Sequence, residues 1–401
     1  MKRLKRDLRN FAALGGEPLF PRPLPVGQLY FPSWERYERA MRGIFEREYY
    51  TNHGPLIAEL EQRLAAFLGV RHAVCVTNAS IGLMISVLAL ELKGKVIVPA
   101  FASIATAQSL SWAGLEPVFC DVDPDRGCMT PELVEPLIDR GVSGILAVNP
   151  WGGCSDAPAL ERLAQRHGLR LYFDSAHAFG CRSDGRMLGG FGSLEVFSFH
   201  ASDILSAADG GCISTNDDLI AARLRSMRSS YGIGTPAPVP VTCNGRFSEA
   251  QAALALLSFE DFPANRERNK ALFQAYRAGV GAIPGLTVVE PRGVELSNHE
   301  HLACRVDESR FGLSRDDLAR LLQAENVQAA RPFYPGSHRL APYDALFPKH
   351  ESALPNTDAL AGSLMQLPLG AMVDEADVRA ICSLLGAAHE HAAELRTSFA
   401  G

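Results

Sequence analysis

Lysine is scarce in this sequence, and it is missing from the middle of the chain. The only lysines are Lys2, Lys5, Lys93, Lys95, Lys270 and Lys349, so none lies between residues 95 and 270. An enzyme that binds a carbonyl compound covalently through an amine uses a lysine side chain for that purpose. A lysine nucleophile from the central part of the chain is therefore excluded.

Long apolar runs and blocks of like charge are missing as well. No stretch of about 18 apolar residues occurs, and the basic start is followed by Asp7 and Arg9 instead of an apolar segment. We therefore expect a cytoplasmic protein that is neither secreted by this route nor inserted in a membrane. The 39 basic and 45 acidic residues are spread along the chain and leave a net charge of −6, which argues against a nucleic-acid partner.

The cysteines form no recognisable framework. There are nine of them, an odd number, and no two are spaced as C-x-x-C. This spacing gives no sign of a zinc site, so we expect no metal centre. Free thiols in a reducing compartment are the simplest interpretation.

Short apolar runs separated by helical patterns indicate an α/β fold. The runs are residues 73–77, 96–98, 117–120, 145–148, 171–173 and 196–199. They are rich in β-branched and aromatic residues, as expected of strands that are buried on both faces of a parallel sheet. Between them, apolar residues recur at helical spacing, for example Ile57, Leu60 and Leu64. The pattern predicts a mostly parallel, doubly wound sheet covered by helices.

The alternation of strands and helices stops near residue 244. A long helical pattern follows, which we expect to break at Pro263, and strand-like residues return at 286–289. Ser314 and Asp374 are expected to begin two later helices. Because the length and the 47% apolar content suit two cores, we predict a large domain over residues 1–255 and a smaller C-terminal α+β domain over residues 256–401.

Eight phrases along the chain occur in an order and spacing that point to one family. They are residues 50–55 (YTNHGP), 77–80 (TNAS), 117–124 (PVFCDVDP), 174–180 (DSAHAFG), 196–200 (VFSFH), 210–211 (GG), 244–247 (NGRF) and 367–369 (LPL). Together they resemble the DegT-type family of nucleotide-sugar aminotransferases, from Gly15 to Leu385. The resemblance implies the fold of aspartate aminotransferase (fold type I), a sugar-nucleotide substrate and a site for pyridoxal phosphate (PLP).

By this resemblance, Asp174 and His177 would face the ring of the cofactor. Asp174 would keep the ring nitrogen protonated, from the C-terminal end of its strand, where open α/β sheets bind ligands. His177 would lie against the ring and is a candidate for catalysis. From the residues alone, Asp174 could also be a helix N-cap and His177 a packed core histidine.

The phosphate would be bound at the start of a helix. The resemblance assigns it to the backbone N–H groups of Ala79 and Ser80 and to the hydroxyl groups of Ser80 and Ser198. It also implies that Asn244 reaches the phosphate from the second subunit of a homodimer. From the residues alone, Ser80 could be an N-cap and Asn244 a turn residue.

Two departures from the family pattern bear on the chemistry, and a third, Asp209 in place of a glutamate before the paired glycines, is minor. The Schiff-base lysine of the family lies five residues after the serine that corresponds to Ser198, and here that position is Asp203. A carboxylate cannot form an imine, so we expect no covalently bound cofactor and keep noncovalent PLP or pyridoxamine phosphate (PMP) as the open possibility. Ser103 replaces an aromatic residue that stacks on the ring, which would weaken ring binding by ~1 kcal/mol.

Three classes of function fit this combination. The first is an acid/base reaction, without transamination, on a sugar nucleotide or related secondary-metabolite intermediate, with Asp203 and His200 transferring protons. The second is a dehydratase-like enzyme that holds PMP noncovalently. The third is a noncatalytic partner of an active aminotransferase. Ordinary transamination would require that Asp203 stands in place of a native lysine.

Overall fold

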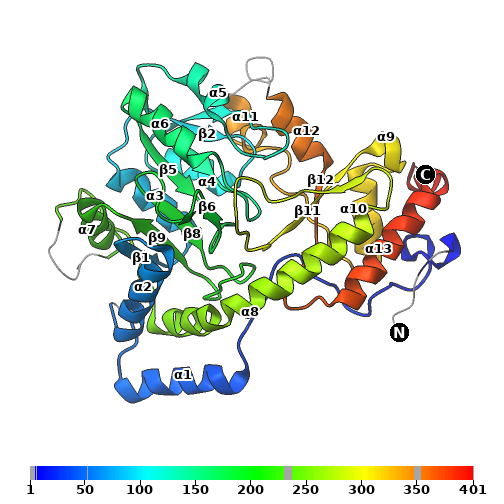
Figure 1. The fold of residues 1–401 in the computed structure, drawn as a ribbon, viewed down its shortest axis with the longest axis horizontal. Helices are drawn as coiled ribbons and strands as arrows, with labels where there is room; N and C mark the ends of the chain where they lie inside the picture. Colours follow the sequence, from blue (N-terminus) through cyan, green and yellow to red (C-terminus); the bar gives the residue numbers. More distant parts are fainter. Residues whose placement is uncertain (1–4, 6, 52, 230–236, 347–353, 401) are drawn as a thin grey trace.

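A seven-stranded sheet lies at the centre of the larger part of the molecule (Figure 1). The computed structural model describes residues 5, 7–51, 53–229, 237–346 and 354–400. Side by side, the strands are β1 (His72–Val76), β9 (Gly211–Thr215), β8 (Glu195–Ser198), β5 (Arg170–Asp174), β4 (Val142–Val148), β2 (Lys95–Pro99) and β3 (Glu116–Cys120). Of these seven, only β9 runs antiparallel to its neighbours. The mostly parallel sheet expected from the sequence is confirmed.

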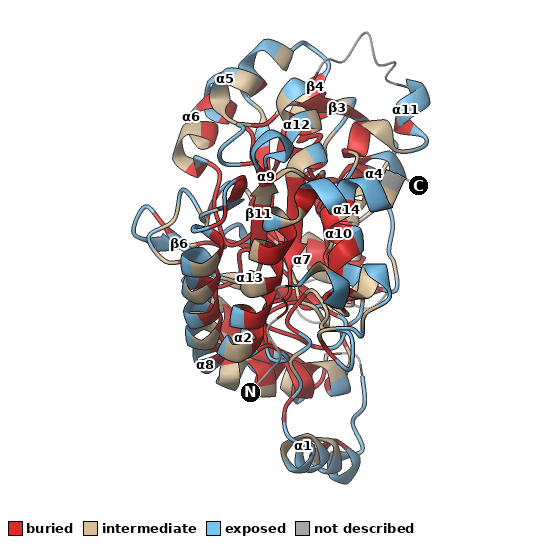
Figure 2. Ribbon diagram, turned by 90° about the vertical axis from the view of Figure 1, so that its right-hand side faces the viewer, coloured by how far each residue is buried: buried red, intermediate tan, exposed pale blue. Residues whose placement is uncertain are grey.

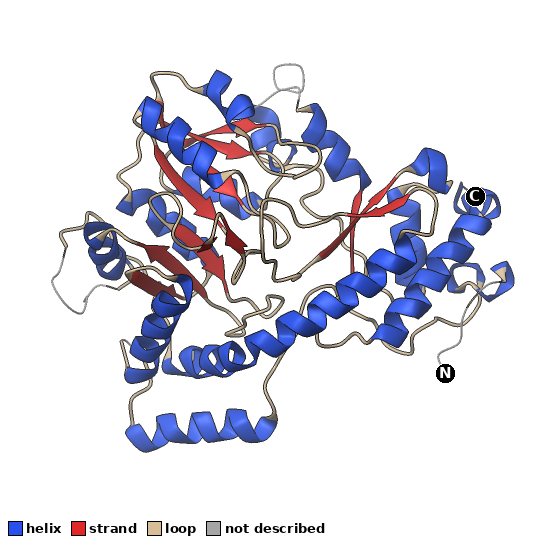
Figure 3. Ribbon diagram, viewed as in Figure 1, coloured by secondary structure: helices blue, strands red, loops and turns tan. Residues whose placement is uncertain are grey.

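Helices cover both faces of this sheet, as Figure 3 shows. One face packs against α2 (Pro55–Leu68), α5 (Pro131–Val134) and α6 (Ala157–His167), and the other against α3 (Ala79–Ala89), α4 (Ile104–Trp112) and α7 (Asp218–Met227). Successive side chains of a strand point to opposite faces of the sheet, so each strand contributes to both cores. On β1, Cys75 packs in the first core, and its neighbours Val74 and Val76 pack in the second. The result is the doubly wound architecture predicted above.

The C-terminal part has its own antiparallel sheet and core. The sheet has the order β10 (Leu286–Val288), β11 (Leu302–Val306), β12 (Leu364–Leu367). Its helices are α9 (Glu308–Phe311), α10 (Arg315–Ala324), α11 (Tyr343–Leu346), α12 (Pro355–Ser363), α13 (Glu375–Glu390) and α14 (Ala392–Ala400). Ser314 and Asp374 are the N-caps of α10 and α13, as expected from their sequences. A hairpin of β6 (Arg182–Ser183) and β7 (Arg186–Met187) lies outside both sheets.

Helix α8 (Glu249–Val280) joins the two parts and corrects one expectation. The predicted break at Pro263 does not occur, and the helix continues through this residue. Packing outweighs the hydrogen bond that proline removes, because the neighbouring Phe262 ring contacts the rings of Phe67 and Phe179 in the first core. Position 255 lies inside α8, and Phe11 packs in the C-terminal core, so the division into residues 1–255 and 256–401 stays a prediction.

Helix α1 (Trp34–Arg47) stands apart from the buried body of the protein (Figure 2). Only Ile44 of this helix is buried, while the Trp34 and Phe45 side chains are 66% and 69% exposed. In the part of the chain that the structure describes, no helix is both long and apolar enough to cross a membrane.

Candidate active site

The sequence-predicted site residues lie at the C-terminal ends of the parallel strands. At the end of β1, Asn78 caps α3, and its Oδ1 accepts from the Ile81 N–H at 2.9 Å. Ala79 and Ser80 are the first two residues of this helix. A Cβ atom on Gly211 would come within 2.8 Å of the Ala79 nitrogen, so the glycine permits the close approach of β9 to the helix start. Ser198, the last residue of β8, lies next to Gly211 in the sheet register, and this end of α3 is suited to bind an anion.

A small cavity brings three further candidates together. Its lining includes Ser103, Asp174, His177 and Phe333, with Val148, Asn149 and Ala176 completing it. Asp174 ends β5, and its Oδ2 accepts from the Thr106 hydroxyl at 2.7 Å. Burial raises the pKa of Asp174, because its partners, the Thr106 hydroxyl and the Ala176 N–H, are neutral. A protonated pyridine nitrogen would supply the missing positive charge.

Phe333 is a wall of this cavity that the sequence did not reveal. Its ring is nearly parallel to those of His177 and Trp151, at centroid distances of 6.0 and 5.9 Å, and edge-on to Phe101 at 5.2 Å. The backbone of Phe333 has φ +54°, which is unfavourable for a bulky residue and is held here by the packed rings. Phe333 thus gives an aromatic surface to the cavity that Ser103 also lines. Ser103 itself caps α4, its Oγ accepting from the Ala105 N–H at 3.3 Å.

Asp203 lies in the loop after β8 and is only 6% exposed. Its Oδ2 accepts from the backbone N–H of His200 at 2.8 Å, and its Oδ1 from the Ser202 hydroxyl at 3.3 Å. The Ser198 hydroxyl also hydrogen-bonds to this carboxyl group. Burial nevertheless outweighs these donors and raises the pKa of Asp203 to about 6. A carboxyl group of this kind can both accept and return a proton near neutral pH.

The two candidate histidines occupy opposite environments. The His200 ring is exposed, and its Nδ1 lies 2.9 Å from the Ser202 Oγ, so the ring reaches Asp203 only through that hydroxyl. The His177 ring is buried, and burial lowers its pKa to about 4, which keeps the ring neutral. It packs against the His301 ring at a centroid distance of 4.3 Å.

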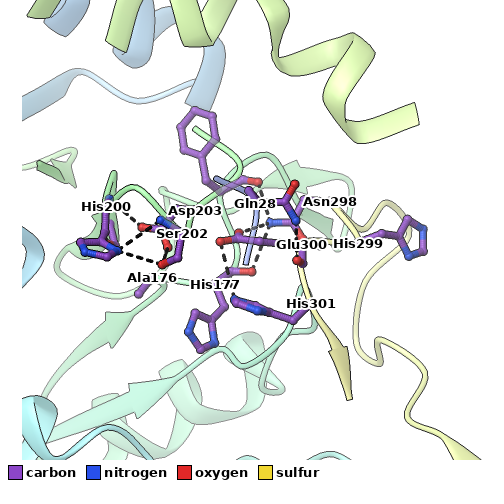
Figure 4. A network of polar contacts seen from close by, with 12 residues as sticks. Gln28, Ala176, His177, His200, Ser202, Asp203, Asn298, His299, Glu300 and His301 are labelled. Carbon is purple, nitrogen blue, oxygen red and sulfur yellow. Dashed lines mark hydrogen bonds and ion pairs between the residues drawn. The ribbon is translucent and has the colours of Figure 1, made fainter. Parts of the chain in front are cut away.

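A polar segment just before β11 was missed by the sequence reasoning. It contains Asn298, Glu300 and His301, all close to Asp203 or His177 (Figure 4). The Asn298 Nδ2 donates to the carbonyl oxygens of His177 and Phe179, each at 3.1 Å, which ties the segment to the loop after β5. The available signal was a glutamate between two histidines at the entrance to an apolar strand.

Asn244 lies beside the end of β1. The carbonyl oxygen of the adjacent Gly245 accepts from the Thr77 N–H at 3.0 Å, and the Asn244 Oδ1 accepts from the Arg246 Nε at 3.0 Å. Its expected contact with the phosphate of a second subunit stays a prediction.

The donors described above fit the phosphate and ring nitrogen of a B6 cofactor held without a covalent bond. The start of α3 and Ser198 would hold the phosphate, and Asp174 the ring nitrogen. The residue that would provide a covalent link is absent, because Asp203 occupies its place. The residues present therefore fit noncovalent binding only.

Known proteins resemble this chain along nearly its whole length. The model of the DegT/DnrJ/EryC1/StrS aminotransferase family matches residues 34–386. A dTDP-4-amino-4,6-dideoxy-D-glucose transaminase of Shigella dysenteriae is 33% identical over 314 residues, 78% of this chain and 85% of the relative. A protein of the same name from Escherichia coli is 28% identical, over 90% of this chain and 98% of the relative. The crystal structure of DesI in the presence of its TDP-sugar product superposes with a TM-score of 0.93 at 36% identity, covering 98% of this chain and 100% of that one.

Proposed function

The chain belongs to the DegT/DnrJ/EryC1/StrS aminotransferase family, and on that premise we propose that it catalyses an acid/base reaction, not a transamination, on a nucleotide-linked deoxysugar. The observation that carries the proposal is Asp203. A buried carboxyl group with a pKa raised to about 6 stands where the family resemblance places a lysine. This position retains a group that can move a proton but has lost the amine that transamination requires.

The substrate class follows from what the relatives are named for. Two relatives are transaminases of a dTDP-linked 4-amino-4,6-dideoxyglucose, and DesI was solved with a TDP-sugar product. A transaminase of that kind interconverts the 4-amine and the corresponding 4-ketone. We infer that this chain takes a dTDP-linked 4-keto sugar of the same kind. The hydrogens on carbons next to the ketone are acidic, because the electron pair left behind delocalises onto the carbonyl oxygen.

Each candidate residue has a distinct part in such a reaction. Asp203 removes or returns the proton next to the ketone. His177, which is buried and neutral, supplies a hydrogen bond without charge. The exposed His200 exchanges protons with solvent, and Ser202 lies between its ring and Asp203, at 2.9 and 3.3 Å.

The test is hydrogen exchange in D₂O. We expect the purified protein to incorporate deuterium next to the ketone of dTDP-4-keto-6-deoxyglucose, faster than the ketone does alone, as measured by proton NMR. An amino donor such as glutamate should not be needed. The opposite result is that nothing happens to the keto sugar until an amino donor is added, and that an amine product then appears. This would mean that the protein transaminates and that the proposal is wrong.

The retained cofactor donors favour a second candidate, a PMP-dependent dehydratase-like enzyme. Asp174, whose Oδ2 accepts from the Thr106 hydroxyl, and the start of α3 would hold the ring nitrogen and the phosphate of such a cofactor. Bound PMP would supply an electron sink at its ring. Near-ultraviolet or visible absorbance from the purified protein would favour this candidate. A protein that shows neither absorbance nor exchange would instead be the noncatalytic partner of an active aminotransferase.

The exposed aromatic residues of α1 support the expected homodimer. Trp34 and Phe45 lie on a helix that contributes little to the core of its own chain, and the adjacent Tyr50 is 52% exposed. A stable monomer seldom exposes such a cluster. We expect sedimentation velocity at micromolar concentration to give twice the mass of one chain for the wild type. The double variant Trp34→Glu/Phe45→Glu should give the mass of a single chain. A monomeric wild type would remove the subunit-shared part of the proposal.

A further inference from the structure

A second buried carboxyl group, Glu300, lies beside Asp203 and has no part in the function proposed above. Its side chain is 1% exposed. The Ile204 N–H, one residue after Asp203, hydrogen-bonds to the Glu300 carboxyl group, and Asn298 Nδ2 donates to its Oε2 at 3.1 Å. The two carboxyl groups are near enough that the charge of Asp203 raises the pKa of Glu300. Figure 4 shows Asp203 and Glu300 side by side, although they lie almost a hundred residues apart in the sequence.

Gln28 holds the two segments in this arrangement. Its backbone N–H donates to the Ser202 carbonyl oxygen at 2.8 Å, and its Nε2 donates to the Glu300 carbonyl oxygen at 2.7 Å. Its Oε1 accepts from Asn269 Nδ2 of helix α8 at 2.9 Å. Gln28 is fully buried, so these bonds are not shared with solvent. The proximity of the two carboxyl groups is therefore built into the fold and does not depend on mobile side chains.

No buried positive charge among the described residues balances the two carboxyl groups, although the charged form of the exposed His200 ring lowers the pKa of Asp203. Among the described residues, no lysine or arginine side chain forms an ion pair with either one. The titratable groups that face them are the rings of His177, His200 and His301 and the thiol of Cys181. Burial lowers the pKa of both His177 and His301, so these rings are neutral at neutral pH. Two adjacent buried carboxylates without a cation cannot both be ionised at low cost.

We propose that Asp203 and Glu300 share one proton, with Asp203 as the ionised member and Glu300 as the protonated one. The order follows from the donors. Asp203 accepts from a backbone N–H and two serine hydroxyls, which stabilise its charge. Glu300 has an Oε1 atom with no hydrogen-bond partner in the described structure, 3.6 Å from the His301 Nε2, which also has none. Burial and the charge of Asp203 raise the pKa of Glu300 well above its usual range.

This inference rests on the proposed function for its role in turnover. When the substrate loses a proton, that proton goes to an Asp203 oxygen and the electron pair of the broken bond stays on the substrate. The carboxyl pair then passes from one negative charge to none. Return of the proton to the substrate restores the charge. Glu300 is thus a positioning residue, because it fixes the starting charge of Asp203 without touching the reacting carbon.

The state of Glu300 can be measured without any substrate. Infrared spectra of the protein at neutral pH contain the carbonyl stretch of each protonated carboxyl group, and the wild-type spectrum minus that of Glu300→Gln isolates the Glu300 band. We expect this band to be present and to titrate at a lower pH in Asp203→Asn, because the neighbouring charge is gone. Absence of the band at neutral pH would overturn the proposal. If the band titrates at the same pH in Asp203→Asn as in the wild type, Asp203 and Glu300 do not share a proton.

Glu195 provides a matched control. It is buried on β8, and burial raises its pKa to about 7, but it bonds to Ser175 and to the N–H groups of Gly189 and Phe191. Its band, isolated with Glu195→Gln, should not respond to Asp203→Asn.

The pH profile of exchange gives an independent readout. We expect Glu300→Gln to keep the rising limb, due to Asp203, and to lose the second inflection of the profile at high pH, where Glu300 ionises. An unchanged profile would contradict the proposal, whereas a correct infrared result without any exchange would reject only the proposed function.

Discussion

Asp203→Asn lowers the rate of deuterium exchange into the keto sugar by ~10²–10⁴-fold, the usual contribution of a positioned acid/base group. The amide has the size of the carboxyl group and can still accept from the His200 N–H, so the loop keeps its main hydrogen bond. Only the titratable group is lost. Proton NMR in D₂O measures the rate, with the sugar at saturating concentration so that a change in affinity does not enter.

Asp184→Asn is the matched control for this substitution. Asp184 is exposed on the β6–β7 turn with φ +51°, a conformation that asparagine tolerates well. We expect the Asp184→Asn protein to catalyse exchange at the rate of the wild type. If Asp203→Asn exchanges as fast as Asp184→Asn, the carboxyl group is dispensable. The noncatalytic and PMP-dependent interpretations would then be preferred.

The stability of Asp203→Asn relative to the wild type should rise from acidic to neutral pH, which separates lost chemistry from lost folding. Burial raises the pKa of Asp203 from 3.8 to about 6 on folding. A carboxyl group with a raised pKa favours the folded state while it is protonated, and this contribution is lost as the pH rises through about 6. Between about pH 4 and pH 7.5, the free energy of unfolding of Asp203→Asn should therefore rise relative to that of the wild type.

The strands and helix starts were predictable because they depend on local signals. Apolar runs such as 145–148 and 171–173 lie within β4 and β5, and Ser314 and Asp374 begin helices as expected. Pro263 was misjudged because its tolerance depends on the ring contacts of Phe262 with a distant core. A sequence pattern reports the local cost of proline but not the packing that offsets it.

The residues of the candidate site also fall into those that local sequence signals reveal and those that depend on distant contacts. Asp174 and Ser198 end strands that carry family phrases, and Asp203 follows one of them, so the sequence pointed to all three. Phe333 and Glu300 could not be found, because their importance comes from long-range contacts. Phe333 reaches the cavity from the C-terminal part of the chain, and Glu300 reaches Asp203 through the bridging Gln28. The roles of these residues remain predictions, of which the Asp203 and Glu300 variants test two.

Asp203→Lys restores the missing amine and should convert the protein into one that captures PLP covalently. The proposed donors for the phosphate and ring nitrogen are the start of α3 and Asp174, so the introduced amine would need only to be close to the aldehyde. After borohydride reduction with excess PLP, peptide mass spectrometry should find the cofactor attached at position 203. The wild type should show no attachment within residues 96–269, where it has no lysine.

Glu300 makes this prediction more specific. Its carboxyl group contacts position 203, so in Asp203→Lys it would lose its proton to the amine and hold the amine in the charged, unreactive form. The double variant Asp203→Lys/Glu300→Gln should therefore capture PLP faster than the single variant at neutral pH, and the difference should narrow as the pH rises. Asp184→Lys, which adds an exposed lysine on the β6–β7 turn, controls for nonspecific labelling. A folded double variant without label at position 203 would show that the start of α3 and Asp174 do not form a cofactor site, and a single variant that labels as fast as the double would show that Glu300 does not control the charge at this position.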